Sequence, residues 1–232
     1  MKHFFREHYP YIFFSPHTMP NYYYHKGFVW IDIWGIDIEQ LHLHRVLEHI
    51  EQLHERMDNW QNEKKYKEIF SFIEKKVSFP LFIQNFSIIP DEQKYDVFRN
   101  IYQRSEYNFH HLTPDFLETI FAYSKYSSDW KNERKKLNQV LDSEGYLTIY
   151  RGESSKSTRI ENAWSWTLSY SIAHFFATRF SDKGIIYQAK VLSKNVADYI
   201  PDRKEEEILV HPKQVDIVAK KNVWKYEVDT EF

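Results

Sequence analysis

The spacing of apolar residues changes at Gly145, and this change constrains the fold more than any other feature. Before Gly145, apolar residues recur every three or four positions, as they do on the buried face of a helix. After it, the chain reads as short strand-like runs of β-branched and aromatic residues, with one short helix over 169–180. We therefore expect an α+β protein, with a mostly helical region at 1–144 and a second domain at 145–232.

Capping signals and prolines set the helix boundaries expected in the first region. Asp37 and Gln40 form a capping-box pattern, and Thr113 followed by Pro114 is a strong helix start. Helices are expected over 37–57, 66–77, 90–102, 113–121 and 128–142, the second ending before Pro80. The last one is expected to turn Trp130, Leu137, Val140 and Leu141 inward and to end before Gly145.

Strands are expected where β-branched and aromatic residues cluster. One precedes the helices, at 28–34, and is closed by Gly35. The others follow Gly145, at 146–151, 185–192, 206–210, 215–219 and 223–228.

Aromatic residues make up 18% of the chain, an unusually large share. The simplest interpretation is a core and interfaces filled by large rings. The alternative is a surface that stacks nucleobases or binds a partner protein.

Composition and charge exclude several functions. The chain has no cysteine, so it has no disulfide framework, zinc-thiolate site or cysteine nucleophile, and it fits a reducing compartment such as the cytoplasm. The formal net charge is −2 and basic residues alternate with acids at 131–136, so a footprint for duplex DNA is not expected, although single strands stay possible. No run approaches the roughly 18 apolar residues that span a bilayer, so a membrane partner is not expected.

Other candidate motifs fail on spacing. His42, His44, His49 and His54 are never three or four residues apart, so they do not share a helical face and no metal site is expected. Ser154 and Ser155 lack a G-x-S-x-G elbow, and the chain has neither G-x-G-x-x-G nor a Walker motif.

Four short elements follow one another in the second domain: Tyr150-Arg151-Gly152, Trp164-Ser165-Trp166-Thr167, the helix 173–180, and Glu205-Glu206-Glu207 before an apolar strand. Together, in this order, they resemble the R-S-E class of mono-ADP-ribosyltransferases. This family includes arginine-specific bacterial toxins, Rho-modifying exoenzymes and small phage and bacterial enzymes. The resemblance covers about 147–218 and implies a split β-sandwich of the ADP-ribosyltransferase type, with NAD⁺ as co-substrate and no metal.

The chemistry of NAD⁺ cleavage explains the need for a carboxylate. Breaking the bond between nicotinamide and ribose develops positive charge on the sugar, which a nearby carboxylate stabilises. The resemblance implies that Glu207, the second glutamate of an E-x-E motif, bonds the nicotinamide-ribose hydroxyl, and that Glu205 orients or deprotonates the nucleophile. Three glutamates in a row blur the register, but only Glu205 with Glu207 gives an E-x-E pair before Ile208.

The resemblance assigns roles to the remaining motif residues. Arg151 would hold the diphosphate or the adjacent ribose with its charged fork. Gly152 would let the backbone approach the ligand and bond the nicotinamide amide, and Ser165 would brace Glu207 with the help of Thr167. Phe176 and Arg179 would form a wall of the pocket, and the segment 198–204 would be the target-recognition loop, which makes Tyr199 and Arg203 candidates for acceptor contact.

The function implied is transfer of ADP-ribose to a macromolecule. The E-x-E form is associated with arginine acceptors, whereas aromatic richness leaves a base of single-stranded RNA or DNA open. The region 1–144 would select the target or contact a neutralising antitoxin or chaperone, as in toxin–antitoxin or anti-phage defence systems. Two alternatives stay open: an NAD⁺ glycohydrolase on the same fold, and a non-enzymatic binding module.

Overall fold

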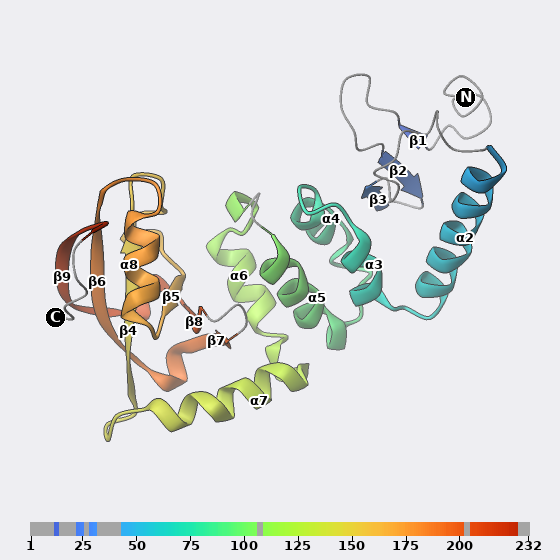
Figure 1. Cartoon of the computed structure of the whole chain (residues 1–232). Helices are drawn as coiled ribbons and strands as arrows, with labels where there is room; N and C mark the ends of the chain where they lie inside the picture. Colours follow the sequence, from blue (N-terminus) through green and yellow to red (C-terminus); the bar gives the residue numbers. More distant parts are fainter. Residues whose placement is uncertain are drawn as a thin grey trace. The chain divides into compact units, whose positions relative to one another are not determined.

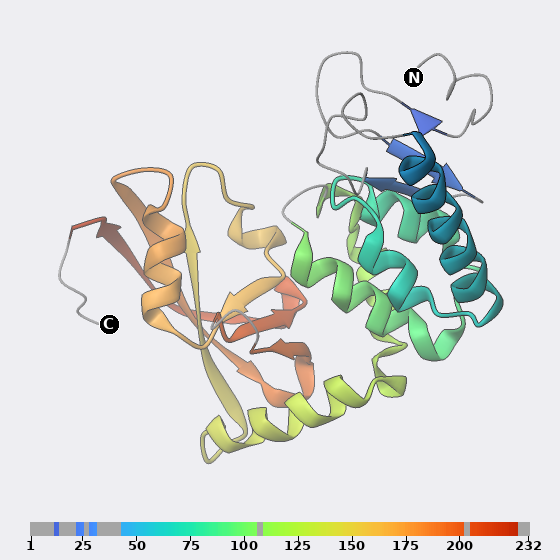
Figure 2. The same cartoon turned by 45° about the vertical axis from the view of Figure 1, so that its right-hand side comes forward.

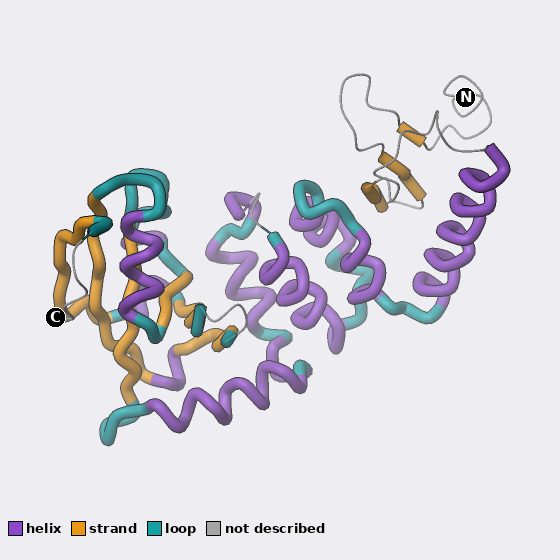
Figure 3. The backbone as a smooth tube through the Cα atoms, in the orientation of Figure 1, coloured by secondary structure: helices purple, strands orange, loops and turns teal. Residues whose placement is uncertain are grey.

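The computed structural model describes residues 12–13, 22–25, 28–31, 43–105, 109–201 and 205–226. The chain forms two compact units that divide between Ser127 and Ser128. Helices dominate the described part of the first unit and strands that of the second (Figure 3). The α+β class is therefore confirmed.

The N-terminal unit combines a small sheet with a set of helices. Strands β1 (Ile12–Phe13), β2 (Tyr22–His25) and β3 (Phe28–Ile31) pair antiparallel in that order, so the strand expected at 28–34 is confirmed over its described part. The described helices are α2 (Leu43–Asn62), α3 (Tyr66–Phe72), α4 (Ser78–Asn85), α5 (Asp91–Arg104) and α6 (Pro114–Phe121), with 3₁₀ turns at Phe109–His111 and Ser124–Tyr126. The capping box expected at Asp37 and Gln40 lies outside the described residues.

Aromatic rings fill the core of this unit. The largest fully buried side chains here are Tyr95, Phe70, Phe79, Phe82 and Phe98. Phe70 and Phe82 meet edge to face with ring centroids 5.8 Å apart, which is a favourable geometry for aromatic pairs. Much of the aromatic excess in the helical region therefore serves packing.

One proline does not end a helix where the sequence indicates that it should. The run expected to continue to residue 77 ends at Phe72, and α4 then begins at Ser78 with Pro80 inside its first turn. The first N–H groups of a helix have no intrahelical acceptor, so a proline there removes no hydrogen bond. The helix start at Thr113 is confirmed, because its hydroxyl accepts a hydrogen bond from the Phe116 amide at 3.3 Å.

The C-terminal unit is built on one antiparallel sheet (Figure 1). Its six strands have the order β7-β8-β5-β4-β6-β9. The strands are β4 (Tyr146–Glu153), β5 (Ser165–Thr167), β6 (Lys183–Leu192), β7 (Val196–Ile200), β8 (Glu207–Val210) and β9 (Asp216–Trp224), and the helices are α7 (Ser128–Leu137) and α8 (Tyr170–Thr178). 3₁₀ turns lie at Asn138–Val140, Ile160–Asn162, Ser193–Asn195 and Pro212–Gln214. The two strands expected at 215–219 and 223–228 are one strand, because β9 pairs along β6 through a register shift at Gln188/Ala189.

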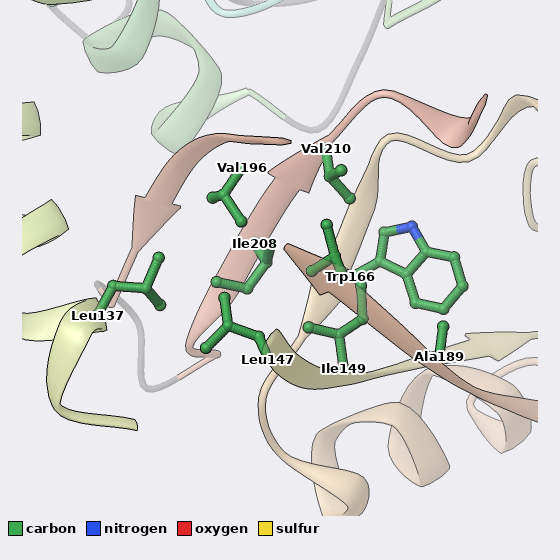
Figure 4. Close-up of a cluster of buried hydrophobic side chains, with 9 residues drawn as sticks. Leu137, Leu147, Ile149, Trp166, Ala189, Val196, Ile208 and Val210 are labelled. Atoms are coloured by element: carbon green, nitrogen blue, oxygen red, sulfur yellow. The ribbon is translucent and has the colours of Figure 1, made fainter. Parts of the chain in front are cut away.

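Helix α7 belongs to this unit, whereas the sequence placed the boundary after residue 144. Leu137 is buried in the same cluster as Leu147, Ile149 and Trp166 (Figure 4). Val140 lies in the 3₁₀ turn that follows and is 56% exposed, so the expectation that it points inward is wrong.

Helix α8 packs on β4 and β6 (Figure 2). Ala173 and Ala177 are fully buried against this face. A Cβ atom added to Gly152 of β4 would lie 1.9 Å from the Ala173 carbonyl oxygen, so only glycine permits this approach. No helix in the described part of the chain is both long and apolar enough to cross a bilayer.

Candidate active site

The sheet is weakly joined between β4 and β5. Strand β4 pairs with β6 along its whole length, from Tyr146 to Glu153, but with β5 only where Tyr150 faces Thr167. Strand β5 pairs instead with β8, so that Thr167 faces Glu207. Three of the four motifs therefore meet on neighbouring strands β4, β5 and β8.

The Arg151 side chain bridges the two weakly joined strands. Its Nη1 donates to the Ser165 carbonyl oxygen at 2.5 Å, and its Nη2 donates to the Thr158 carbonyl oxygen at 3.0 Å. The guanidinium is thereby held at the end of β4, partly exposed, with its positive charge next to the Ser-x-Thr strand.

Ser165 contacts both charged motif residues. Its carbonyl accepts from Arg151, and its hydroxyl donates to Oε1 of Glu207. A hydroxyl that donates to a carboxylate fixes the orientation of that carboxylate. One serine therefore positions a cation and an anion, each half-exposed.

The segment before Glu207 is fixed by Thr167 and its neighbour. The Thr167 hydroxyl donates to the Glu205 carbonyl oxygen at 2.6 Å, and the Leu168 amide donates to the Glu206 carbonyl oxygen at 3.1 Å. Glu206 itself has a φ of 46°, in the left-handed region that non-glycine residues seldom adopt. Such backbone is retained only where its surroundings hold it, and here the hydrogen bonds from the Ser-x-Thr strand do so.

Three further motif residues lie on or under α8. The space beside Gly152 is occupied by the α8 backbone, so its close approach is to that helix; a bond to nicotinamide stays a prediction. Phe176 lies within α8, and Arg179 follows its end. The Arg179 guanidinium lies over two rings, 4.3 Å from the Phe180 centroid and 5.1 Å from the Phe176 centroid.

The expected target-recognition loop is in part a strand. Residues Asp198 to Ile200 belong to β7, and Tyr199 faces Ile208 across the β7–β8 pairing. The pKa of Tyr199 is raised, first by burial and then by the negative charges of Glu206 and Glu133. Tyr199 is thus held at the edge strand beside the glutamates, while Arg203 lies outside the described residues.

A buried glutamate that no sequence motif indicates supports Arg151. Glu153, 5% exposed, accepts hydrogen bonds from Arg159 Nη1 and from the Ile160 amide, each at 3.0 Å. These bonds fix the segment that contains Thr158, whose carbonyl holds Arg151. The position of Glu153, two residues after Arg151 on the same strand, is the only sign in the sequence that Glu153 belongs to this site.

Among the described residues, no group of three or more histidine, aspartate or glutamate side chains is placed to hold a metal ion. His44 is exposed, and burial lowers the pKa of His54. His42 and the His49 side chain lie outside what the structure describes.

No protein-family model, curated protein or solved structure matches this chain. The resemblance to a family therefore depends on the four motifs and on their arrangement alone.

Proposed function

We propose that the C-terminal unit cleaves NAD⁺ and transfers ADP-ribose to a macromolecular acceptor. The observation that carries the proposal is the double role of Ser165, whose carbonyl holds Arg151 and whose hydroxyl holds Glu207. The weak joint between β4 and β5 also suits the split β-sandwich that the resemblance implies.

Arg151 and Glu207 suit two parts of the NAD⁺ molecule, its diphosphate and its nicotinamide ribose. A guanidinium presents its N–H donors in a planar fork that matches the geometry of a phosphate, so Arg151 would hold the diphosphate. The Glu207 carboxylate, oriented by Ser165, would face the ribose carbon on which positive charge develops. The nicotinamide ring would leave with the electron pair of the glycosidic bond, and the acceptor nucleophile would form the new bond to that carbon.

Glu205 is the proposed base. It would take the proton that the acceptor loses as the new bond forms, so that atoms and charge balance. Its carbonyl accepts a hydrogen bond from Thr167, and Glu206, with its positive φ, separates it from Glu207. The acceptor is an arginine side chain or a base of a single-stranded nucleic acid, and the N-terminal unit would select it or bind a neutralising protein.

The test uses NAD⁺ labelled on its adenylate phosphate, incubated with the full chain and a cell lysate. Release of nicotinamide is measured, and the labelled polymer is identified by separate protease and nuclease digestion. We expect Glu207→Gln to lower nicotinamide release by about a hundredfold or more. Glu206→Gln is the matched control, because it removes the same charge from the neighbouring exposed residue, and it should stay close to wild type.

Each result has a distinct meaning. Label on protein or nucleic acid supports the transferase and names the acceptor class. Nicotinamide release without any labelled polymer favours an NAD⁺ glycohydrolase on the same site. If neither nicotinamide nor label appears, or if Glu207→Gln retains full activity, the proposal is wrong.

A further inference from the structure

Helix α7 carries a hollow that the proposed reaction does not use. It is a shallow depression, widely open to solvent, with a volume of about 350 Å³. The residues that line it all come from α7 and the turn after it: Trp130, Lys131, Arg134, Lys135 and Asn138. Three of these five side chains are cationic, and none is acidic.

Helix α7 places acidic and basic residues, which are mixed in the sequence, on different sides of the helix. At about 100° per residue, the five lining positions cover an arc of about 140°. Asp129 and Glu133 lie on the opposite flank, where Glu133 accepts a hydrogen bond from Lys136 at 3.0 Å. The segment 129–136 mixes two acidic with four basic residues, and the folded helix gathers Lys131, Arg134 and Lys135 on one flank that has no acid.

Two of the lining residues are held rigidly against the sheet. The Trp130 indole N–H donates to the Ala197 carbonyl at 2.7 Å, and Arg134 donates to the Val196 and Ser193 carbonyls at 2.8 and 2.9 Å. The Arg134 guanidinium lies 5.1 Å from the Trp130 ring centroid. This pair forms a fixed wall that combines an aromatic surface with positive charge.

The two lysines are available to a ligand. Lys131 and Lys135 are exposed, one helical turn apart, and neither forms an ion pair with any residue that the structure describes. Two mobile ammonium groups beside an indole suit a ligand with closely spaced negative charges and flat apolar groups. A single-stranded nucleic acid has both, because phosphates would contact the lysines while a base packs against the ring.

We infer that this flank of α7 binds single-stranded nucleic acid. An acidic peptide would satisfy the lysines but would leave the aromatic wall without a planar partner, so the observations favour the nucleic acid. Binding as such does not depend on NAD⁺ chemistry; only the further step, that the bound strand is the acceptor, rests on the proposed function.

The hollow is connected through β7 to the strand that carries Glu207. Trp130 is bonded to Ala197, three residues before Ile200, whose partner across the sheet is Glu207. At about 3.3 Å per residue, this strand segment is about 10 Å long. This is the separation along β7 only, because Glu207 and its neighbour Ile208, which packs with Leu137 of α7, point to opposite faces of the sheet.

The experiment measures fluorescence anisotropy of a labelled oligonucleotide of about twelve nucleotides with the full chain, without NAD⁺. Oligouridine and oligothymidine are compared, because the 2′-hydroxyl distinguishes RNA from DNA. Salt is varied between about 50 and 200 mM, since each phosphate contact to a single strand contributes about 0.7 to the slope of log K against log salt.

The double variant Lys131→Ala/Lys135→Ala should weaken binding about tenfold at the lowest salt and reduce the salt slope by about 1.4. Lys75→Ala/Lys76→Ala removes the same charge from exposed positions of the N-terminal unit and is the matched control. It should leave both quantities unchanged, and circular dichroism of both double variants checks that the fold is retained.

Three results would overturn the inference: neither oligonucleotide binds, both double variants weaken binding equally, or a polyglutamate peptide binds this flank more tightly than the oligonucleotides. Because NAD⁺ is absent, none of these results bears on nicotinamide release. The failure of this inference and the failure of the proposed function are therefore distinguishable.

Discussion

Replacing Gly152 by alanine tests why a glycine follows the motif arginine. The added Cβ would lie 1.9 Å from the Ala173 carbonyl oxygen and 2.5 Å from the Ala177 amide nitrogen, both backbone atoms of α8. Ordinary contact begins at 3.4 Å, so α8 would have to move by about 1.5 Å. Ala173 and Ala177 are fully buried, so this movement would disrupt a packed face.

The cost should lie at the upper end of overpacking effects, about 3 kcal/mol. For a unit of this size that corresponds to a fall in melting temperature of about 12 °C or more. Thermal unfolding of the full chain is followed by far-ultraviolet circular dichroism and by tryptophan fluorescence, to which the buried Trp166 contributes.

Gly145→Ala is the matched control. Gly145 has a φ of +82° and nothing within 4 Å of an added Cβ, so alanine there meets only backbone strain of about 1–2 kcal/mol. If Gly152→Ala costs no more than Gly145→Ala, the helix contact does not explain Gly152, and close approach of a ligand becomes the better explanation.

Three further predictions concern neighbouring residues. Ser165→Ala removes the hydroxyl that donates to Glu207 and should lower nicotinamide release about ten- to a hundredfold. Ser165→Thr keeps a hydroxyl and should restore most of the activity. Equal rates in the wild type and both variants would contradict the positioning role of Ser165. Because the φ of Glu206 is 46°, Glu206→Val should lower the free energy of unfolding by about 1–2 kcal/mol in urea titrations, whereas Glu206→Gly should be tolerated. Equal urea midpoints for the two variants would contradict the argument from backbone conformation. The pKa of Tyr199 is raised above its unfolded value of 10.0, so its contribution to stability is complete below pH 10 and falls as pH rises through the higher folded pKa. Tyr199→Phe should therefore lose less stability than wild type between about pH 9 and 11 in urea titrations, and parallel losses would refute this assignment.

Elements with strong local signals could be predicted from the sequence. Thr113 caps α6, and α8 begins after Ser169, whose hydroxyl accepts from the Ile172 amide at 3.4 Å. Strand β4 also lies where its β-branched and aromatic residues indicate. In each case the deciding interaction is local, so the residues that make it are close in sequence.

Elements that depend on distant partners could not be predicted in this way. Strand β7 contains the polar but buried Asp198, and the pairing of β7 with β8 and its cover by α7 make this segment a strand. The sequence predicts two strands where the structure has the single strand β9, because the continuity of β9 comes from its pairing with β6.

The candidate site shows the same division. The order of the motifs predicts Arg151, Ser165 and Glu207 as site residues, and they lie on adjacent strands. The carbonyls that hold Arg151, and the support from Glu153, depend on how far β4 and β5 separate, which no local pattern encodes.

The attachment of α7 to β7 bears on how the C-terminal unit can be isolated. A fragment that begins at Gly145 would lack the indole and guanidinium that occupy the carbonyls of a sheet margin, and would uncover the apolar cluster that Leu137 closes. An uncovered margin of this kind invites strand addition between molecules and precipitation. A soluble fragment should therefore begin at or before Ser128.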